Sequence, residues 1–201
     1  MDMQAARTER PTLTMPEAEA GMLRAAYDGA ESILEYGSGG SRVLAAGMAG
    51  KRVTSVESDR GWLRRMNRWF AANPPAESTL VNLVWANIGP TRNWGHPADL
   101  SQWQKFATYL LGVWQRDGFV HPDVVLVDGR FRIGCALATA FGITRKVTLL
   151  SDDYASRGWF AQVEEFLGTP RLVGRMAVFE VAPMAVPPDR LKKIIRFMQR
   201  P

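Results

Sequence analysis

A cluster of glycines lies between an apolar run and a helical pattern, in the stretch ILEYGSGGSRVLAA that starts at Ile33. Glycine allows a sharp turn and leaves backbone amides at the start of a helix free to face a ligand. Glu57 ends the next β-branched run 20 residues after Gly37, where a carboxylate can bind both hydroxyls of a ribose. The spacing predicts a ligand that contains adenosine. The turn itself consists of Gly37, Ser38, Gly39, Gly40 and Ser41.

The residue at position 42 distinguishes between classes of adenosine ligand. The dinucleotide-binding pattern GxGxxG needs a third glycine there, because helix and strand pack closely at that point. The chain has Arg42 instead, and the bulk of this side chain opposes such packing. NAD and FAD are therefore disfavoured. Ser41, one residue earlier, can cap the helix through its hydroxyl.

The glycine turn resembles motif I of the class I S-adenosylmethionine-dependent methyltransferases, in which an acid precedes GxGxG. The motif in this chain reads Glu35-Tyr36-Gly37-Ser38-Gly39-Gly40-Ser41, with serine in place of the last glycine. The resemblance extends over about residues 16–185, because the last strands also look like the reversed edge of that family's seven-stranded sheet. It implies that the protein binds S-adenosylmethionine.

By this resemblance, the cofactor-binding residues follow the ends of successive strands. Gly37 and Gly39 would line the methionine part of the cofactor, and Glu35 would support the loop. Asn87 would lie beside the adenine. Asp128 would border the methyl group and the acceptor, which makes it a candidate catalytic residue. The complete implied set is Glu35, Tyr36, Gly37, Ser38, Gly39, Glu57, Ser58, Asn87, Ile88 and Asp128.

Three aspartates follow the fourth and fifth predicted strands. Asp128 ends the run DVVLVD, and Asp152 and Asp153 follow KVTLLS. Adjacent parallel strands lie about 4.8 Å apart, so the three carboxylates can converge on a hard divalent cation such as Mg²⁺. The placement resembles metal-dependent O-methyltransferases and implies a metal that lowers the pKa of an acceptor hydroxyl. The alternative is that Asp152 or Asp153 only caps the helix that follows.

Other polar and aromatic residues lie close to these positions in the sequence. Arg130 and Arg132 can bind a carboxylate or phosphate of the acceptor, or form salt bridges with the aspartates. His96, in the turn-rich segment NWGHP, is the candidate general base, with a surface loop position as the alternative. Trp94 and Trp103 can cover an apolar acceptor or simply pack the loop. The motifs that mark methylation of nucleic-acid bases, [DNS]PP[YFW] and Pro-Cys, are missing.

An α/β fold is needed to bring these residues together. Apolar strand patterns alternate with helical patterns, which predicts a Rossmann-like, seven-stranded, mostly parallel sheet with an antiparallel edge pair and helices on both faces. We expect a single domain over residues 1–201, with an N-terminal helical extension at 1–30 and a basic C-terminal helix at 189–201. An insertion at 88–117 is predicted to form a lid that contains a helix at about 100–116.

Composition excludes several functional classes. The net charge is +5, but residues 189–201 hold a net +4, so the body is nearly neutral and nucleic-acid binding is not expected. No run approaches the ~20 apolar residues that span a bilayer, and the N-terminus lacks an apolar signal segment, so we expect a cytoplasmic protein without membrane contact. Cys135 is the single cysteine, which excludes an intrachain disulfide and predicts a buried thiol.

Together these features favour an S-adenosylmethionine-dependent methyltransferase that acts on a small molecule. Metal-assisted transfer to oxygen is the more specific hypothesis, and a homodimer is left open. One alternative is a methyltransferase-like cofactor-binding or regulatory protein without catalysis, which Ser41 and Asn87 favour. Another is an RNA methyltransferase that uses the basic tail. Aminopropyl transfer is a more distant alternative, because its glycine- and acid-rich signature differs from EYGSGGS.

Overall fold

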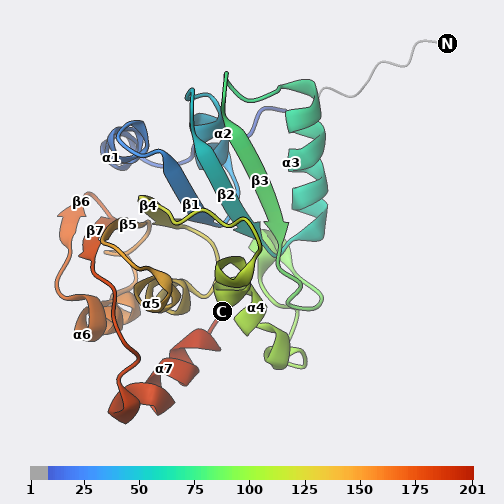
Figure 1. The fold of residues 1–201 in the computed structure, drawn as a ribbon. Coiled ribbons are helices and arrows are strands. Elements are labelled where there is room, and N and C mark those ends of the chain that lie inside the picture. Colours follow the sequence, from blue (N-terminus) through green and yellow to red (C-terminus); the bar gives the residue numbers. More distant parts are fainter. Residues whose placement is uncertain (1–8) are drawn as a thin grey trace.

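The computed structural model describes residues 9–201, so the predictions for residues 1–8 lie outside the described residues. Its strands form one seven-stranded sheet in the order β3-β2-β1-β4-β5-β7-β6 (Figure 1). β7 pairs antiparallel with both β5 and β6, and the other pairs are parallel, which confirms the predicted sheet and its reversed edge. The strands are β1 (Ser32–Tyr36), β2 (Arg52–Glu57), β3 (Leu80–Trp85), β4 (Val124–Val127), β5 (Val147–Ser151), β6 (Arg171–Val173) and β7 (Met176–Val181).

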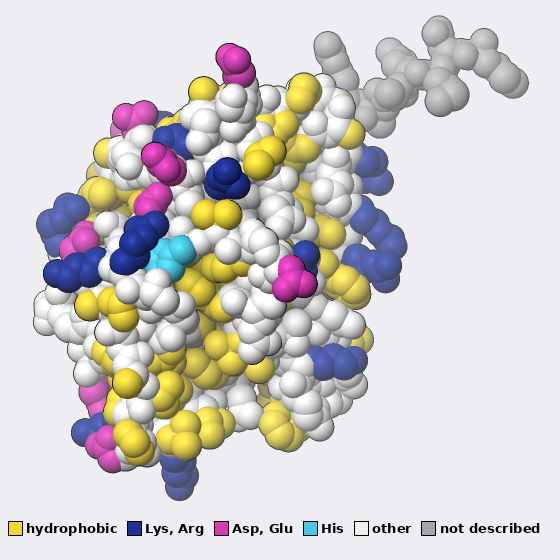
Figure 2. All heavy atoms as spheres, viewed as in Figure 1, with side chains coloured by type: hydrophobic (Ala, Val, Ile, Leu, Met, Phe, Trp, Pro, Cys, Tyr) yellow, Lys and Arg dark blue, Asp and Glu magenta, His cyan; other side chains and the backbone are white. Residues whose placement is uncertain are grey.

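Helices cover both faces of this sheet, so the fold has three layers (Figure 1). One face packs against α1 and α2, with α3 beside them, and the other against α4, α5 and α7. Figure 2 shows apolar side chains gathered over α4, α5 and α7, and basic side chains along the edge that α3 forms. The helices are α1 (Glu17–Asp28), α2 (Gly40–Ala46), α3 (Arg60–Ala72), α4 (Ala107–Leu111), α5 (Arg132–Gly142), α6 (Glu164–Leu167) and α7 (Leu191–Met198).

Burial along the chain follows from this layering. All four residues of β4 are buried, because the central strand is covered on both faces. The edge strand β3 alternates between exposed and covered residues. In α5 the small residues of RIGCALATAFG let the helix lie close to the sheet, and Cys135 is fully buried, as predicted. Within residues 9–201, none of the helices has the length and apolar character that a bilayer crossing requires.

The long helix predicted at about residues 100–116 is wrong. The segment forms three short pieces instead: η2 (Trp103–Lys105), α4 and η3 (Gly112–Gln115). Gly112 is a poor helix former, and the two flanking pieces take tighter 3₁₀ turns. Likewise, WFAQVEEFLG does not form one helix but the 3₁₀ segment η4 (Gly158–Val163) followed by α6.

Residues 9–16, which precede α1, form an N-terminal strap that lies against the glycine turn. A Cβ atom at Gly40 would lie 2.2 Å from the backbone carbonyl carbon and oxygen of Thr12 and 2.3 Å from the amide nitrogen of Leu13. Leu13 and Met15 pack their side chains against the cluster between the sheet and α1. Gly40 is therefore required for the approach of the strap and not for a left-handed backbone conformation.

Candidate functional site

The candidate site lies at the carboxyl ends of β1 and β4. These neighbouring strands lead to α2 and α5, which cover opposite faces of the sheet, so a crevice opens where their connections diverge. Gly37 has a φ angle of 106°, and a Cβ atom there would lie 2.9 Å from the amide nitrogen of Gly129. The two loops after β1 and β4 thus touch across the crevice, and glycine at both positions permits this approach.

Within the glycine turn, neighbouring positions face different surroundings. A Cβ atom at Gly39 would have no protein atom within 4 Å, so this position faces open space, as a ligand-binding position should. The Ser38 hydroxyl is buried without a hydrogen-bond partner, while its carbonyl accepts a bond from the Trp62 indole. Gly39 is the N-cap of α2 and no side chain caps the helix, so the predicted cap at Ser41 is wrong.

Glu35 supports the turn from inside the protein. Its carboxylate is fully buried and accepts hydrogen bonds from the Tyr27 hydroxyl at 2.8 Å and the Ser55 hydroxyl at 2.6 Å. Burial raises its pKa, although these two hydroxyls oppose the effect. Tyr36 likewise turns its side chain into the core, where its hydroxyl donates to the Leu110 carbonyl at 2.7 Å. Only the backbone of Tyr36 borders the crevice.

Arg42 lies inside the protein, although the sequence suggested only that its bulk opposes close packing. Its side chain is fully buried, and none of the three nitrogens of its guanidinium group has a hydrogen-bond partner. The guanidinium carbon lies 5.4 Å from the centroid of the Phe70 ring in α3. Burial lowers the pKa of Arg42 to about 10, while the negative charge of Glu35 acts in the opposite direction.

Glu57 ends β2, as predicted, and its carboxylate is held by the following backbone. Its Oε1 atom accepts hydrogen bonds from the amides of Ser58 at 2.7 Å and Asp59 at 2.8 Å. Burial is the largest influence on Glu57 and raises its pKa. The segment after β3 lies directly above: the Ser58 hydroxyl donates to the Gly95 carbonyl at 2.9 Å, and a Cβ atom at Gly95 would lie 3.2 Å from Glu57 Oε1.

The two residues predicted to lie beside an adenine follow β3. Asn87 is exposed, and its side-chain oxygen accepts a hydrogen bond from the amide of Gly89 at 3.1 Å, which closes a local turn. Ile88 is buried in the core. Asn87 therefore keeps its amide group at the surface. Of the two tryptophans predicted to cover an acceptor, Trp94 is 86% exposed and Trp103 is 50% exposed, so neither is packed into the core.

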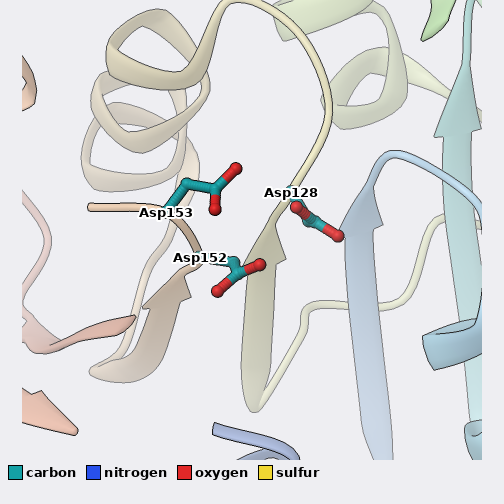
Figure 3. A group of neighbouring side chains, drawn as sticks. All are labelled: Asp128, Asp152 and Asp153. Atoms are coloured by element: carbon teal, nitrogen blue, oxygen red, sulfur yellow. The ribbon is translucent and has the colours of Figure 1, made fainter. Parts of the chain in front are cut away.

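The three predicted aspartates come together between the ends of β4 and β5 (Figure 3). Asp128, Asp152 and Asp153 each offer a carboxylate oxygen, and these atoms all lie within 4.8 Å of one another. Figure 3 shows Asp128 after β4, with Asp152 and Asp153 after β5. Neither Asp152 nor Asp153 caps the next helix, whose N-cap is Arg157. The sequence therefore predicted this cluster correctly as a structural feature.

Arginines surround the same carboxylates. Arg132 lies 3.1 Å from Asp128 and 3.6 Å from Asp153, while Arg175 binds Asp152 through two bonds of 2.9 and 3.2 Å. For Arg132 the structure therefore shows the second of the two alternatives, salt bridges with the aspartates.

A third arginine completes this ion-pair network. Arg157 lies 3.1 Å from the carboxylate of Asp153, and Arg175 also reaches Asp153 at 3.2 Å. Burial raises the pKa of Asp128 to about 6, although the charge of Arg132 acts to lower it. Three carboxylates thus face three guanidinium groups. The donor set suits a hard cation, but a cation would have to compete with these arginines.

His96 and Arg130 meet across the crevice. His96 belongs to the segment above Glu57, and its Nε2 atom contacts the Arg130 guanidinium from the loop after β4. Burial, followed by the positive charges of Arg130, Arg92 and Arg157, lowers the pKa of His96. A histidine with a lowered pKa is neutral at pH 7, which a general base requires.

Several residues of the site carried no clear signal in the sequence. Tyr27 lies in α1, far from the motif, and Arg175 lies in the turn between β6 and β7. Thr12 in the strap also went unrecognised. Gly95 had a usable signal, because NWG lies in a turn-rich segment and the residue takes a left-handed φ of 69°. Long-range packing places the other three.

Comparison with known proteins finds one solved structure that is similar in sequence and in fold, and several that are similar in fold alone. No protein-family model and no curated protein matches the chain. A methyltransferase-like protein from Silicibacter pomeroyi has 63% sequence identity and a TM-score of 0.93, over 96% of this chain and 99% of that chain.

Two solved O-methyltransferase structures are similar in fold. TomG from Streptomyces achromogenes, involved in tomaymycin synthesis and solved with S-adenosylmethionine, has 16% identity and a TM-score of 0.54, over 85% of this chain and 82% of that chain. An O-methyltransferase from Bacillus cereus, solved with S-adenosylhomocysteine, has 12% identity and a TM-score of 0.52, over 82% of this chain and 80% of that chain.

Proposed function

Because the chain belongs to the class I S-adenosylmethionine-dependent methyltransferase superfamily, we propose that it transfers a methyl group from this cofactor to an oxygen of a small molecule. The observation that carries this proposal is the placement of the glycine turn, Glu57 and Asp128 around one crevice at the switch point of the sheet. Gly39 faces open space there, and the Ser38 hydroxyl is buried without a partner, so both fit a bound ligand.

The residues of the chain divide the work of such a transfer. Bound S-adenosylmethionine supplies an electrophilic methyl carbon, and the protein has to orient it and exclude water. Glu57 would hold the ribose and the turn at Gly37 would hold the methionine part. His96 would take the proton of the acceptor hydroxyl, because its lowered pKa keeps the imidazole neutral at pH 7. Asp128 would border the same space.

Metal assistance by Mg²⁺ stays a prediction. Asp128, Asp152 and Asp153 would hold the ion, and oxygen ligands of this kind suit it. Their pairing with Arg132 and Arg175 opposes it, because each guanidinium already neutralises a carboxylate. Magnesium would therefore bind only if these arginine side chains turned away. A calorimetric titration of the free protein with magnesium tests this point, with the Asp152→Asn variant titrated in the same way for comparison.

The cofactor site is tested by calorimetric titration with S-adenosylmethionine and S-adenosylhomocysteine. We expect Glu57→Ala to weaken binding by about 10- to 100-fold, since hydrogen bonds to a charged group contribute ~1.5–3 kcal/mol. Glu77→Ala is the matched control, because Glu77 is an exposed acid just before β3, at the opposite edge of the sheet from Glu57, which ends β2. If the folded wild-type protein bound neither compound, the proposal would be wrong.

A cofactor-binding protein without catalysis is the second candidate. The pairing of Asp128 with Arg132 and of Asp152 with Arg175 favours it, because this pairing opposes metal-assisted catalysis and leaves the glycine turn unaffected. Turnover of any acceptor by the wild-type protein would exclude it. RNA methylation has less support, since Arg190 and Lys193 of the basic tail pair with Glu165 in α6 and are not free for phosphates.

A further inference from the structure

Two arginines that follow β4 have opposite surroundings. Arg132 pairs with Asp128 and Asp153 and donates to backbone carbonyls. Arg130 forms no salt bridge within the described residues, and its Nε atom is buried without a hydrogen-bond partner. The side-chain contact of its guanidinium is with His96 Nε2. A partly buried guanidinium that borders the crevice and has no salt bridge can take an anionic group of a ligand as its partner.

The charges that act on His96 come from arginines of several elements. Arg92 comes from the segment after β3 and Arg157, which also pairs with Asp153, from the loop after β5, and both act on His96 together with Arg130. Asp128 is the acid that acts on Arg130, and it is already paired with Arg132. The crevice above β4 thus gathers basic groups from three elements. An acceptor with a negatively charged group would pair with this positive charge.

The contact with Arg130 also occupies the nitrogen that a general base needs. His96 Nε2 accepts from the guanidinium, so the ring proton lies on Nδ1 in this arrangement. An anion that draws Arg130 toward itself would free Nε2. The Gly129 amide beside Arg130 lies close to the Gly37 position, so Arg130 follows a loop that touches the glycine turn.

We propose that Arg130 is the anion-binding residue of the acceptor site, and that the acceptor is a small molecule with a carboxylate or phosphate group near the hydroxyl that is methylated. The methylation part of this proposal rests on the proposed function, whereas anion binding does not. On binding, the hydroxyl proton passes to His96 Nε2, a carbon–oxygen bond forms, and the carbon–sulfur bond breaks with its electron pair left on sulfur. Arg130 thereby couples anion binding to the freeing of His96 Nε2, the nitrogen that acts as the base.

The two histidines of the chain provide a direct measurement by NMR. His96 lies in the proposed site, while His121 lies elsewhere, with its Nε2 atom bonded to the Thr144 amide. We expect inorganic phosphate or acetate, added at constant ionic strength, to shift the imidazole resonances of His96 and leave those of His121 unchanged. The stronger of the two anions identifies the class of the acceptor group.

Matched variants test whether Arg130 is responsible. Arg130→Gln should raise the anion concentration that gives half of the His96 shift by at least about tenfold, because a charge-assisted bond is lost. Arg116→Gln removes the same charge from an exposed arginine remote from the crevice and should behave as wild type. Should Arg130→Gln fail to fold, Arg130→Lys keeps the charge, loses the fork geometry and should give intermediate binding.

The possible outcomes separate this proposal from the proposed function. No anion-dependent shift of His96 in the wild type, or an equal shift in Arg130→Gln, would overturn the assignment of Arg130. S-adenosylhomocysteine should bind wild type and Arg130→Gln equally, because Arg130 is not part of the glycine turn. Anion binding without any binding of S-adenosylhomocysteine would refute the proposed function and leave the anion site intact.

Discussion

Two adjacent glycines of the turn should fail in different ways when each is replaced by alanine. At Gly40 the added methyl group would lie 2.2 Å from the backbone of Thr12, more than 1 Å inside the normal contact distance of about 3.4 Å. At Gly39 it would meet no protein atom within 4 Å. We therefore expect Gly40→Ala to lower stability and Gly39→Ala to lower cofactor affinity.

The size of the Gly40→Ala effect follows from what the strap can lose. Backbone atoms cannot swing aside, so the strap must move, and overpacking of this kind costs about 1–3 kcal/mol. If the strap detached, the half-buried side chains of Leu13 and Met15 would give up contacts worth about 2 kcal/mol in total. The gain in helix propensity returns at most about 1 kcal/mol. The melting temperature should fall by roughly 2–8 °C for a domain of this size.

The assay pairs denaturant unfolding with titration of S-adenosylhomocysteine for both variants. Gly39→Ala should unfold at nearly the wild-type denaturant concentration and bind the compound at least about tenfold more weakly, because its methyl group enters the predicted ligand space. Gly40→Ala should also expose the bond before Leu13 to thermolysin. Equal loss of stability in both variants would refute the reasoning, and so would full cofactor affinity in Gly39→Ala.

Three further predictions concern charged groups. Arg42→Met should raise the free energy of unfolding by about 1–3 kcal/mol in denaturant titrations, because it removes buried donors without partners; a decrease would mean that Arg42 stabilises the protein through Glu35. Asp152→Asn should lower the same quantity by about 1–3 kcal/mol, since Asp152 is nearly fully buried and holds Arg175 through two bonds, and an unchanged value would show that the pair is dispensable. The pKa of Asp128 is raised from 3.8 to about 6, so its contribution to stability is present below pH 3.8 and is lost as the pH rises through about 6; unfolding measured at pH 5 and pH 8 should differ less in Asp128→Asn than in wild type.

The order of elements and the reversed sheet edge could be predicted from local pattern. Strands and helices alternate, and each type leaves a periodic signature that depends only on neighbouring residues. The long helix at about residues 100–116 was wrong because aromatic residues there pack into the core through short 3₁₀ and α turns, which periodicity alone does not reveal.

The sequence by itself placed the glycine turn, Glu57 and the three aspartates at strand ends, because the carboxyl ends of parallel strands share one edge of the sheet. Only the tertiary structure decided what surrounds them. It turned Glu35 toward Tyr27, paired the aspartates with Arg175 and brought His96 against Arg130, across separations of 8 to 34 residues in the chain. Hydrogen bonds and ion pairs between remote segments leave no periodic trace, since their partners are chosen by the packing of whole layers.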